Sequence, residues 1–256
     1  MSWRGSVATI GVLVRRALHE ITRVPGAAIP GVLAPTIFFL GFTSVFGSLT
    51  LLPGFTTNSY QSFLIPISLL QGAAFTGAAT GVNLARDIEQ GWFDRLLASP
   101  APRPVLLAGL VLSAGLRTLL PATFLLIVAL AVGAHWPGLL GLLIALTLVM
   151  GMAVVAATWG TSLALRFKTQ SAAPIMQVGM FLAVLLTTAY APADLLTGWL
   201  HTVAQINPVT QVVEAVRQGF IGSVSWDDTW PGYLTLFGLA AVLSAFALRG
   251  MRRMTL

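Results

Sequence analysis

Long apolar stretches alternate with short polar segments along almost the whole chain. Six of them are long enough, at about 1.5 Å of helix rise per residue, to cross the ~30 Å hydrocarbon layer of a bilayer. They cover residues 27–46, 62–84, 105–134, 139–165, 172–191 and 231–248. This pattern predicts an all-α integral membrane protein with six transmembrane helices, built as a single membrane domain over residues 27–252.

Arginine and lysine residues mark alternate gaps between these stretches. All but two of the 14 lie before the first stretch, between the second and third, after the fourth, or after the last. The two exceptions are Arg117, inside the third stretch, and Arg217, between the fifth and sixth. Positive charges near span ends are retained on the cytoplasmic side. The distribution therefore predicts an even number of crossings, with both termini in the cytoplasm.

The composition agrees with a lipid environment and removes several classes of protein. The chain is 56% hydrophobic and only 9% charged, against roughly 25% charged residues in soluble domains. It has no cysteine, which excludes disulfides, thiol nucleophiles and cysteine-ligated metals. The net charge of +6 is spread thinly between apolar spans, so we expect no nucleic-acid binding; no metal-binding residues are predicted either. The strong preference for arginine over lysine is typical of GC-rich bacterial genes and favours a bacterial cell (inner) membrane.

Residues 1–26 are predicted to form an amphipathic helix that lies in the plane of the membrane. The apolar residues of one helical stripe are Val7, Ile10, Val14, Leu18 and Ile21. Most of the basic residues, Arg4, Arg15, Arg16 and Arg23, fall on the other side. Such a helix places its arginines near anionic headgroups. The alternative is a solvated leader; a signal peptide is not expected, because the segment lacks a compact apolar stretch before a cleavage site.

The densest cluster of charges is the segment RDIEQGWFDRLLASPAPRP, residues 86–104. In a helix, Ile88, Trp92 and Leu96 share one face, with Phe93 close to it, and charged residues surround that face. Three prolines, at positions 100, 102 and 104, then end the helix. An amphipathic helix on the cytoplasmic side can enter a groove in a partner protein. The alternative is an ordinary loop that contacts lipid headgroups.

Residues 192–230 are too polar to span the membrane and too apolar for a simple loop. Asn207 and Pro208 separate two amphipathic halves, each of about 12 residues or ~18 Å, which is too short to cross the bilayer. A helical hairpin that dips into the outer leaflet fits this pattern, as do two helices lying flat on the surface. Glu214 and Arg217 have the spacing of a local ion pair.

A few residues inside the spans are candidates for a substrate path. Arg117 would be costly if it faced lipid, so we expect it to face the protein interior or a wet cavity, unless it lies near the interface. Methionine and aromatic side chains adapt to varied apolar shapes, although ordinary packing explains them equally. The candidates in the other spans are Gln71, Phe75, Trp159, Met176, Met180, Phe181 and Tyr190.

Other activities lack the residues they need. No G-x-x-x-x-G-K-[ST] loop is present, so the chain has no phosphate-binding loop of its own for ATP. No acidic residue falls within a predicted span, and His19, His135 and His201 lie at or beyond the predicted membrane edges. This inventory disfavours an intramembrane hydrolase and a proton-coupled secondary transporter.

Three segments together resemble type-2 ABC permeases of the daunorubicin-resistance exporter kind. The first lies in the charged cluster and comprises Asp87, Glu89, Gly91, Phe93, Asp94, Arg95, Leu96, Ser99 and Pro100. The second is FTSVFG, from Phe42 to Gly47. The third comprises Asn207, Pro208, Thr210, Glu214, Arg217 and Gly222. With the six-span pattern, the resemblance covers residues 5–252.

The resemblance implies a permease subunit that is not itself an enzyme. ATP and magnesium would bind to a separate nucleotide-binding subunit, present in two copies with two permease halves as a homodimer or heterodimer. The coupling helix that enters this ATPase would be the segment from Arg86 to Leu97, with Arg86, Asp87, Glu89, Gly91, Trp92, Phe93, Asp94, Arg95 and Leu96 as its site residues. The outer hairpin would carry Asn207, Pro208, Glu214 and Arg217. Expected cargo is hydrophobic and drug-like or lipid-like; the alternative is polysaccharide or glycolipid.

Overall fold

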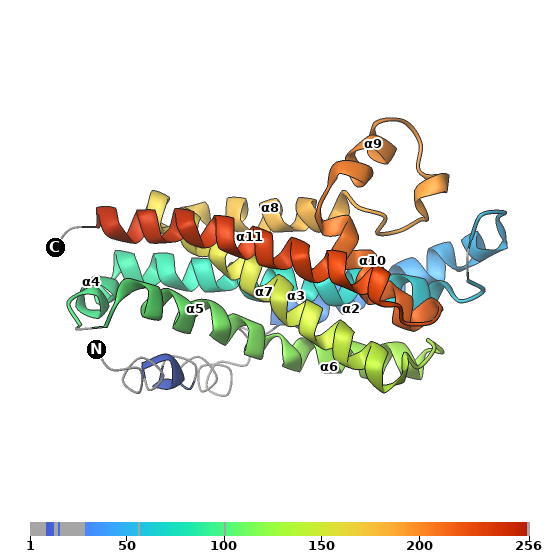
Figure 1. The fold of residues 1–256 in the computed structure, drawn as a ribbon, viewed down its shortest axis with the longest axis horizontal. Coiled ribbons are helices and arrows are strands. Elements are labelled where there is room, and N and C mark those ends of the chain that lie inside the picture. Colours follow the sequence, from blue (N-terminus) through green and yellow to red (C-terminus); the bar gives the residue numbers. More distant parts are fainter. Residues whose placement is uncertain (1–8, 13–14, 16–28, 56, 100, 255–256) are drawn as a thin grey trace.

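The computed structural model describes residues 9–12, 15, 29–55, 57–99 and 101–254. Every regular element within these residues is a helix, and the long helices run side by side in one bundle (Figure 1). The predicted all-α class is therefore confirmed. The interfacial helix predicted for residues 1–26 lies almost wholly outside the described residues.

Five apolar helical stretches are long enough to cross a membrane. They are α2 (Ile29–Phe46) continued by η2 (Gly47–Leu51), α3 (Tyr60–Glu89), α5 (Arg103–Arg117) continued by α6 (Leu119–Ala131), α7 (Gly138–Phe167) and α11 (Trp226–Arg253). These match the predicted spans 27–46, 62–84, 105–134, 139–165 and 231–248. The structure thus confirms a multi-pass membrane protein.

The stretch predicted as the fifth span, residues 172–191, is not one long helix. After a short turn, η3 (Gln170–Ala172), α8 runs from Ala173 to Leu185. Its 13 residues correspond to about 20 Å of rise, less than the hydrocarbon thickness. The prediction of a helix reaching Ala191 is therefore wrong, and the count of six spans is not confirmed.

Two side chains, one of them distant along the chain, bind the carbonyls at the end of α8. The Asn207 amide nitrogen donates hydrogen bonds to the backbone carbonyl oxygens of Ala183, at 2.8 Å, and Leu186, at 2.7 Å. The Thr187 hydroxyl donates to the carbonyl of Val184 at 2.8 Å. Carbonyls at a helix end need such partners when no further turn follows, so the chain leaves the helix here without losing these bonds.

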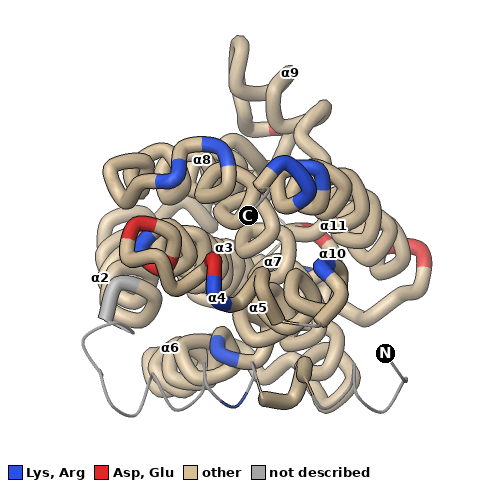
Figure 2. The backbone as a smooth tube through the Cα atoms, turned by 90° about the vertical axis from the view of Figure 1, so that its left-hand side faces the viewer, with Lys and Arg blue, Asp and Glu red and all other residues tan. Residues whose placement is uncertain are grey.

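The two ends of the bundle differ in charge. Basic residues gather at the end where α3, α7 and α11 finish and α5 begins (Figure 2). They are Arg86, Arg95, Arg103, Arg166, Lys168, Arg249, Arg252 and Arg253. Exposed aromatic residues at the opposite end are Trp136, Trp199, Trp226, Trp230 and Tyr233. Aromatic residues are enriched at membrane interfaces, and basic residues gather on the cytoplasmic side, so this pattern suits a bundle whose long axis crosses the bilayer.

The outward faces of the long helices are apolar. Large exposed side chains include Ile37, Ile127, Leu143, Phe237 and Val242, which come from α2, α6, α7 and α11. A soluble monomer rarely exposes so much continuous apolar surface. These faces suit a lipid solvent.

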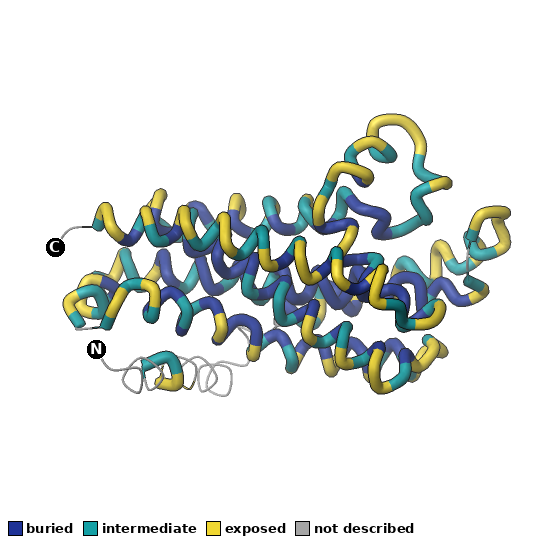
Figure 3. Tube along the Cα trace, in the orientation of Figure 1, coloured by how far each residue is buried: buried dark blue, intermediate teal, exposed yellow. Residues whose placement is uncertain are grey.

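The centre of the bundle is the crossing of α3 and α7, and both helices are buried there (Figure 3). A β-carbon added at Gly77 would lie 2.6 Å from the β-carbon of Ala156, and one added at Gly81 would lie 2.3 Å from the carbonyl carbon of Gly160. Small residues four apart allow such backbone contact between membrane helices. The GAATG sequence of residues 77–81 is the signal for it, although the hydrophobic pattern does not reveal the partner helix.

We expect Gly81→Val to destabilise the protein, because the new side chain meets backbone rather than a movable group. Overpacking of this kind costs about 3 kcal/mol, or roughly 6–12 °C in the unfolding midpoint of a chain this long. Thermal unfolding of the purified protein in detergent, followed by tryptophan fluorescence, measures the change. The matched control is Gly238→Val in α11, where an added β-carbon meets nothing within 4 Å. Equal midpoints for the two variants would contradict this account of the crossing.

Candidate functional site

The predicted coupling segment is bent rather than a single helix. The last turn of α3 ends at Glu89, and a short helix, α4 (Trp92–Leu97), follows. Between them Gly91 has a φ of +70°, a conformation that glycine adopts without steric cost. Its backbone N–H donates to the carbonyl of Ile88 at 3.0 Å, which ends α3 in a glycine cap. The expected continuous helix over residues 86–97 is therefore replaced by two helices joined at Gly91.

Phe93 anchors α4 to the bundle. Its side chain is fully buried in a cluster that includes Leu84, Leu106 and Met251, from α3, α5 and α11. The apolar face predicted from Ile88, Trp92 and Leu96 is only partly buried, because the bend at Gly91 rotates α4. The sequence placed Phe93 at the edge of that face, whereas in the structure Phe93 is the residue of α4 that is buried against the bundle.

The charged residues of the segment remain accessible at the basic end of the bundle. Arg86, Glu89, Asp94 and Arg95 are exposed, and Asp87 is half-buried. Asp94 and Arg95 belong to α4, directly after the buried Phe93. The segment therefore exposes charged side chains, while the apolar packing of Phe93 fixes its backbone to the bundle.

Glu89 ties the end of α3 to the connection between α7 and α8. One carboxylate oxygen accepts hydrogen bonds from the Thr169 hydroxyl at 2.7 Å and from the Gln170 backbone N–H at 3.0 Å. The other accepts from the Gln170 side-chain amide at 2.9 Å. We call this contact the Glu89 clamp. Thr169 and Gln170 carry no signal in the sequence that would pair them with a residue so distant along the chain.

A second polar network surrounds Arg217, which lies in α10 (Val209–Ile221) and is only 2% exposed. Its guanidinium donates to the Glu214 carboxylate and to the carbonyl of Thr188, both at 2.6 Å. It also lies 3.9 Å from the centre of the Phe63 ring in α3, in a cation–π arrangement. The local Glu214–Arg217 pair expected from the spacing is present. It is one part of a network that joins α10 to α3 and to the irregular chain after α8.

The expected break at Asn207 and Pro208 separates two short helices of different character. The apolar stripe of α10 is buried in the core. The preceding helix, α9 (Gly198–Ile206), projects away from the bundle (Figure 1), with Trp199 and Ile206 exposed. Two helices lying flat on the surface, the alternative considered for this region, do not describe the buried α10.

The candidate path residues fall into separate groups. Phe75 of α3 stacks on Phe181 of α8, with ring centres 6.2 Å apart. Trp159 of α7 faces Gly179 of α8, where an added β-carbon would lie 3.0 Å from the indole ring. The others are placed individually: Gln71, Met176 and Met180 are buried, and Tyr190 makes an edge contact with the ring of Phe42 at 4.9 Å. The structure thus places Phe75 and Trp159 against the same short helix.

Arg117 points into the bundle. It ends α5, is half-buried, and donates a hydrogen bond at 2.6 Å to the hydroxyl of Thr80 in α3. The expectation that Arg117 faces the protein interior agrees with this contact.

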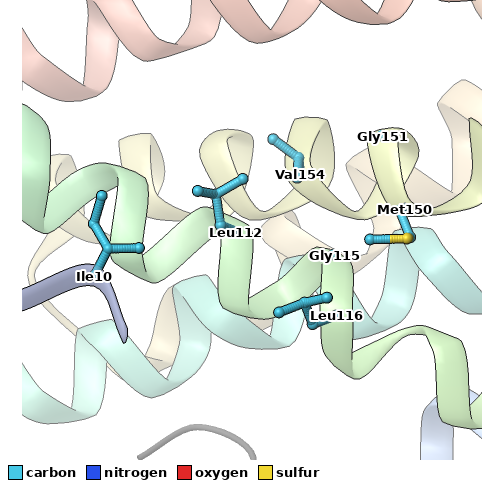
Figure 4. Close-up of a pocket in the computed structure, with 7 residues that line it drawn as sticks. All are labelled: Ile10, Leu112, Gly115, Leu116, Met150, Gly151 and Val154. Carbon is cyan, nitrogen blue, oxygen red and sulfur yellow. The ribbon is translucent and has the colours of Figure 1, made fainter. Parts of the chain in front are cut away.

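An apolar cavity of about 400 Å³ lies between α5 and α7 (Figure 4). Its lining residues are Ile10, Leu112, Gly115, Leu116, Met150, Gly151 and Val154. None of the candidate path residues belongs to this lining. The cavity and the aromatic contacts around α8 are therefore separate features.

Comparison with known proteins agrees with these observations. Residues 8–221 match the family described as ABC-2 type transporter. The daunorubicin resistance ABC transporter permease protein DrrB1 of Streptomyces coeruleorubidus is 25% identical over 243 residues, covering 91% of this chain and 82% of that protein. The probable multidrug ABC transporter permease YbhR of Escherichia coli K12 is 28% identical over 202 residues, covering 76% and 53%.

A third relative is the probable doxorubicin resistance ABC transporter permease protein DrrC of Mycobacterium tuberculosis H37Rv. It is 24% identical over 209 residues, covering 80% of this chain and 72% of that protein. The family match extends from the N-terminal segment through α10 and so includes both polar networks. The chain therefore belongs to the ABC-2 type transporter family and is a multi-pass membrane permease of an ABC transporter.

Proposed function

We propose that this chain is the membrane-spanning subunit of an ATP-driven exporter of hydrophobic drug-like or lipid-like molecules. The main support for the proposal is the geometry of α4. Its Asp94 and Arg95 side chains are exposed, while the buried Phe93 side chain fixes the helix to the bundle. A short helix of this kind fits a groove in a partner protein. Because Phe93 packs against several long helices, a displacement of α4 reaches the membrane-spanning part directly.

The energy would come from a separate nucleotide-binding subunit that holds ATP and magnesium. Membership of the ABC-2 family implies such an ATPase partner and, in general, a dimeric permease. The complete assembly would contain two permease halves and two nucleotide-binding subunits, solvated by membrane lipids. Closure of the ATPase pair would push the two α4 helices, and the halves would rearrange around a central path.

We further propose that the chain crosses a bacterial inner membrane six times, with both termini in the cytoplasm. In this topology α8 and the irregular chain that follows it form the fifth crossing. The outer hairpin would be α9 and α10, with α10 re-entering the outer leaflet. The gathering of basic residues at one end of the bundle and of exposed aromatic residues at the other supports this orientation.

The proposed cargo rests on the printed names of two relatives, which associate them with resistance to daunorubicin and doxorubicin. The aromatic rings of Phe75 and Trp159 beside α8, together with Phe181 of α8 itself, offer the adaptable apolar surface that such flat, amphipathic molecules require.

Single cysteines test the topology, because the natural chain contains none. Both Ala98, after α4, and Thr197, before α9, are exposed. We expect a membrane-impermeant maleimide to label Thr197→Cys in intact cells and Ala98→Cys only in inverted vesicles. Labelling of Ala98→Cys from outside would refute both the topology and the role of α4.

The coupling role is tested by Asp94→Ala in the permease reconstituted with its nucleotide-binding subunit. Loss of one interfacial charge, worth about 1.4 kcal/mol, lowers the affinity of the two proteins about tenfold. At limiting ATPase we expect permease-dependent, vanadate-sensitive ATP hydrolysis and daunorubicin export to fall together by about that factor.

The matched control is Asp194→Ala, which removes an exposed carboxylate at the opposite end of the bundle. It should leave both rates unchanged. Undiminished export by the Asp94→Ala complex would remove the coupling assignment. Export by the purified permease alone, driven by a proton gradient, would replace the proposed function with secondary transport.

A further inference from the structure

The short helix α8 is held at both ends by side chains from other parts of the chain. At the basic end, the Glu89 clamp binds the connection that leads into it. At the other end, Asn207 binds the carbonyls of Ala183 and Leu186. The helix between these attachments carries Met176, Met180 and Phe181, so it forms one wall of the proposed substrate path.

The contact along the side of α8 differs from the α3–α7 crossing. Between α3 and α8, Phe75 and Phe181 meet as nearly parallel rings, at an interplanar angle of 7°. Stacked flat rings can slide past one another, whereas the interlocked backbones of α3 and α7 cannot without separating. The stacked rings alone therefore do not fix the position of α8 along α3, whereas an attachment at the basic end would fix it.

The Glu89 clamp has the right position to be that attachment. Glu89 is the last residue of α3, two residues before the bend at Gly91 that begins the turn into α4. Both of its carboxylate oxygens are occupied, by three donors from Thr169 and Gln170. Because Glu89 is exposed, these bonds add little to folding stability, yet charge-assisted bonds from several donors define a geometry well.

We propose that Glu89 is a positioning residue that transmits the displacement of α4 to α8. When the partner moves α4, the adjoining end of α3 moves with it, and the clamp draws the Thr169–Gln170 connection and α8 along. This inference rests on the proposed function, since it assumes that α4 receives the displacement. It adds the connection between α7 and α8, as a second cytoplasmic element, to the contacts that transmit movement from the ATPase to the proposed substrate path.

A fluorescent reporter on each element tests this route in the complete complex. Bimane attached to Ala98→Cys reports on α4, and bimane attached to Ile175→Cys, which is 52% exposed in the native chain, reports on α8. The permease is reconstituted in lipid with its nucleotide-binding subunit, and emission is compared before and after trapping with ATP and vanadate.

In the otherwise unsubstituted chain we expect both reporters to respond. With Glu89→Ala, the response at Ala98→Cys should persist, and that at Ile175→Cys should fall at least fivefold. The control Asp194→Ala, which removes another exposed carboxylate, should preserve both responses. Thr169→Val combined with Gln170→Ala removes two of the three donors from the other side of the clamp, and should reproduce the effect of Glu89→Ala even if that variant assembles poorly.

The outcomes separate the two proposals. A full response of α8 in the clamp variants would overturn the transmitting role of Glu89 and leave the coupling role of α4 intact. A changed resting emission at Ile175→Cys before nucleotide is added would support the attachment, because the clamp sets the position of α8; the response to trapping is therefore measured against the resting emission of the same variant. Absence of any response at Ala98→Cys in the unsubstituted chain would overturn the proposed function itself.

Discussion

The backbone contact between α3 and α7 fixes the frame on which the other features depend. In lipid, helices gain little from burying apolar side chains, so close van der Waals packing must hold them together. Gly77 and Gly81 provide it by removing the side chains that would keep α7 away. Held in this way, α3 contributes Glu89 at its basic end and Phe63 beneath Arg217 towards the other. Both polar networks are therefore positioned by the same helix.

The Arg217 network shows how a buried charge and an interrupted span stabilise one another. A guanidinium buried to 2% exposure is very costly without partners, and a backbone carbonyl outside a helix is also costly at membrane depth. Arg217 binds the carbonyl of Thr188, and Asn207 binds those of Ala183 and Leu186. The guanidinium of Arg217 thus gains a hydrogen-bond acceptor, and the carbonyls that have left the helix gain hydrogen-bond donors. The chain can thus end α8 early and still remain packed among the other helices.

The same network shows what the sequence could and could not predict. Apolar length and charge segregation predicted five long helices correctly, because both follow directly from the lipid solvent. They overextended the fifth span, since residues 186–191 remain fairly apolar although their carbonyls bind distant side chains. The bend at Gly91 carries a local signal, a glycine after a charged helix end, and could have been predicted. The pairing of Glu89 with Gln170 could not, because it requires the packing of α3 against α7 and α8.

These contacts divide the bundle into a fixed part and an adjustable part. Where backbones interlock, at Gly81 and Gly160, any relative movement must first separate the helices. Where α8 meets α3 through stacked rings, a shift along the helix axis separates no interlocked backbones, and it carries along the chain that Asn207 binds at the carbonyls of Ala183 and Leu186. A displacement applied at the basic end is therefore accommodated most readily by α8. On the proposed mechanism, the glycine crossing of α3 and α7 forms the frame, and the basic end of α3 moves relative to it together with α8, which carries Met180 and Phe181 along the path.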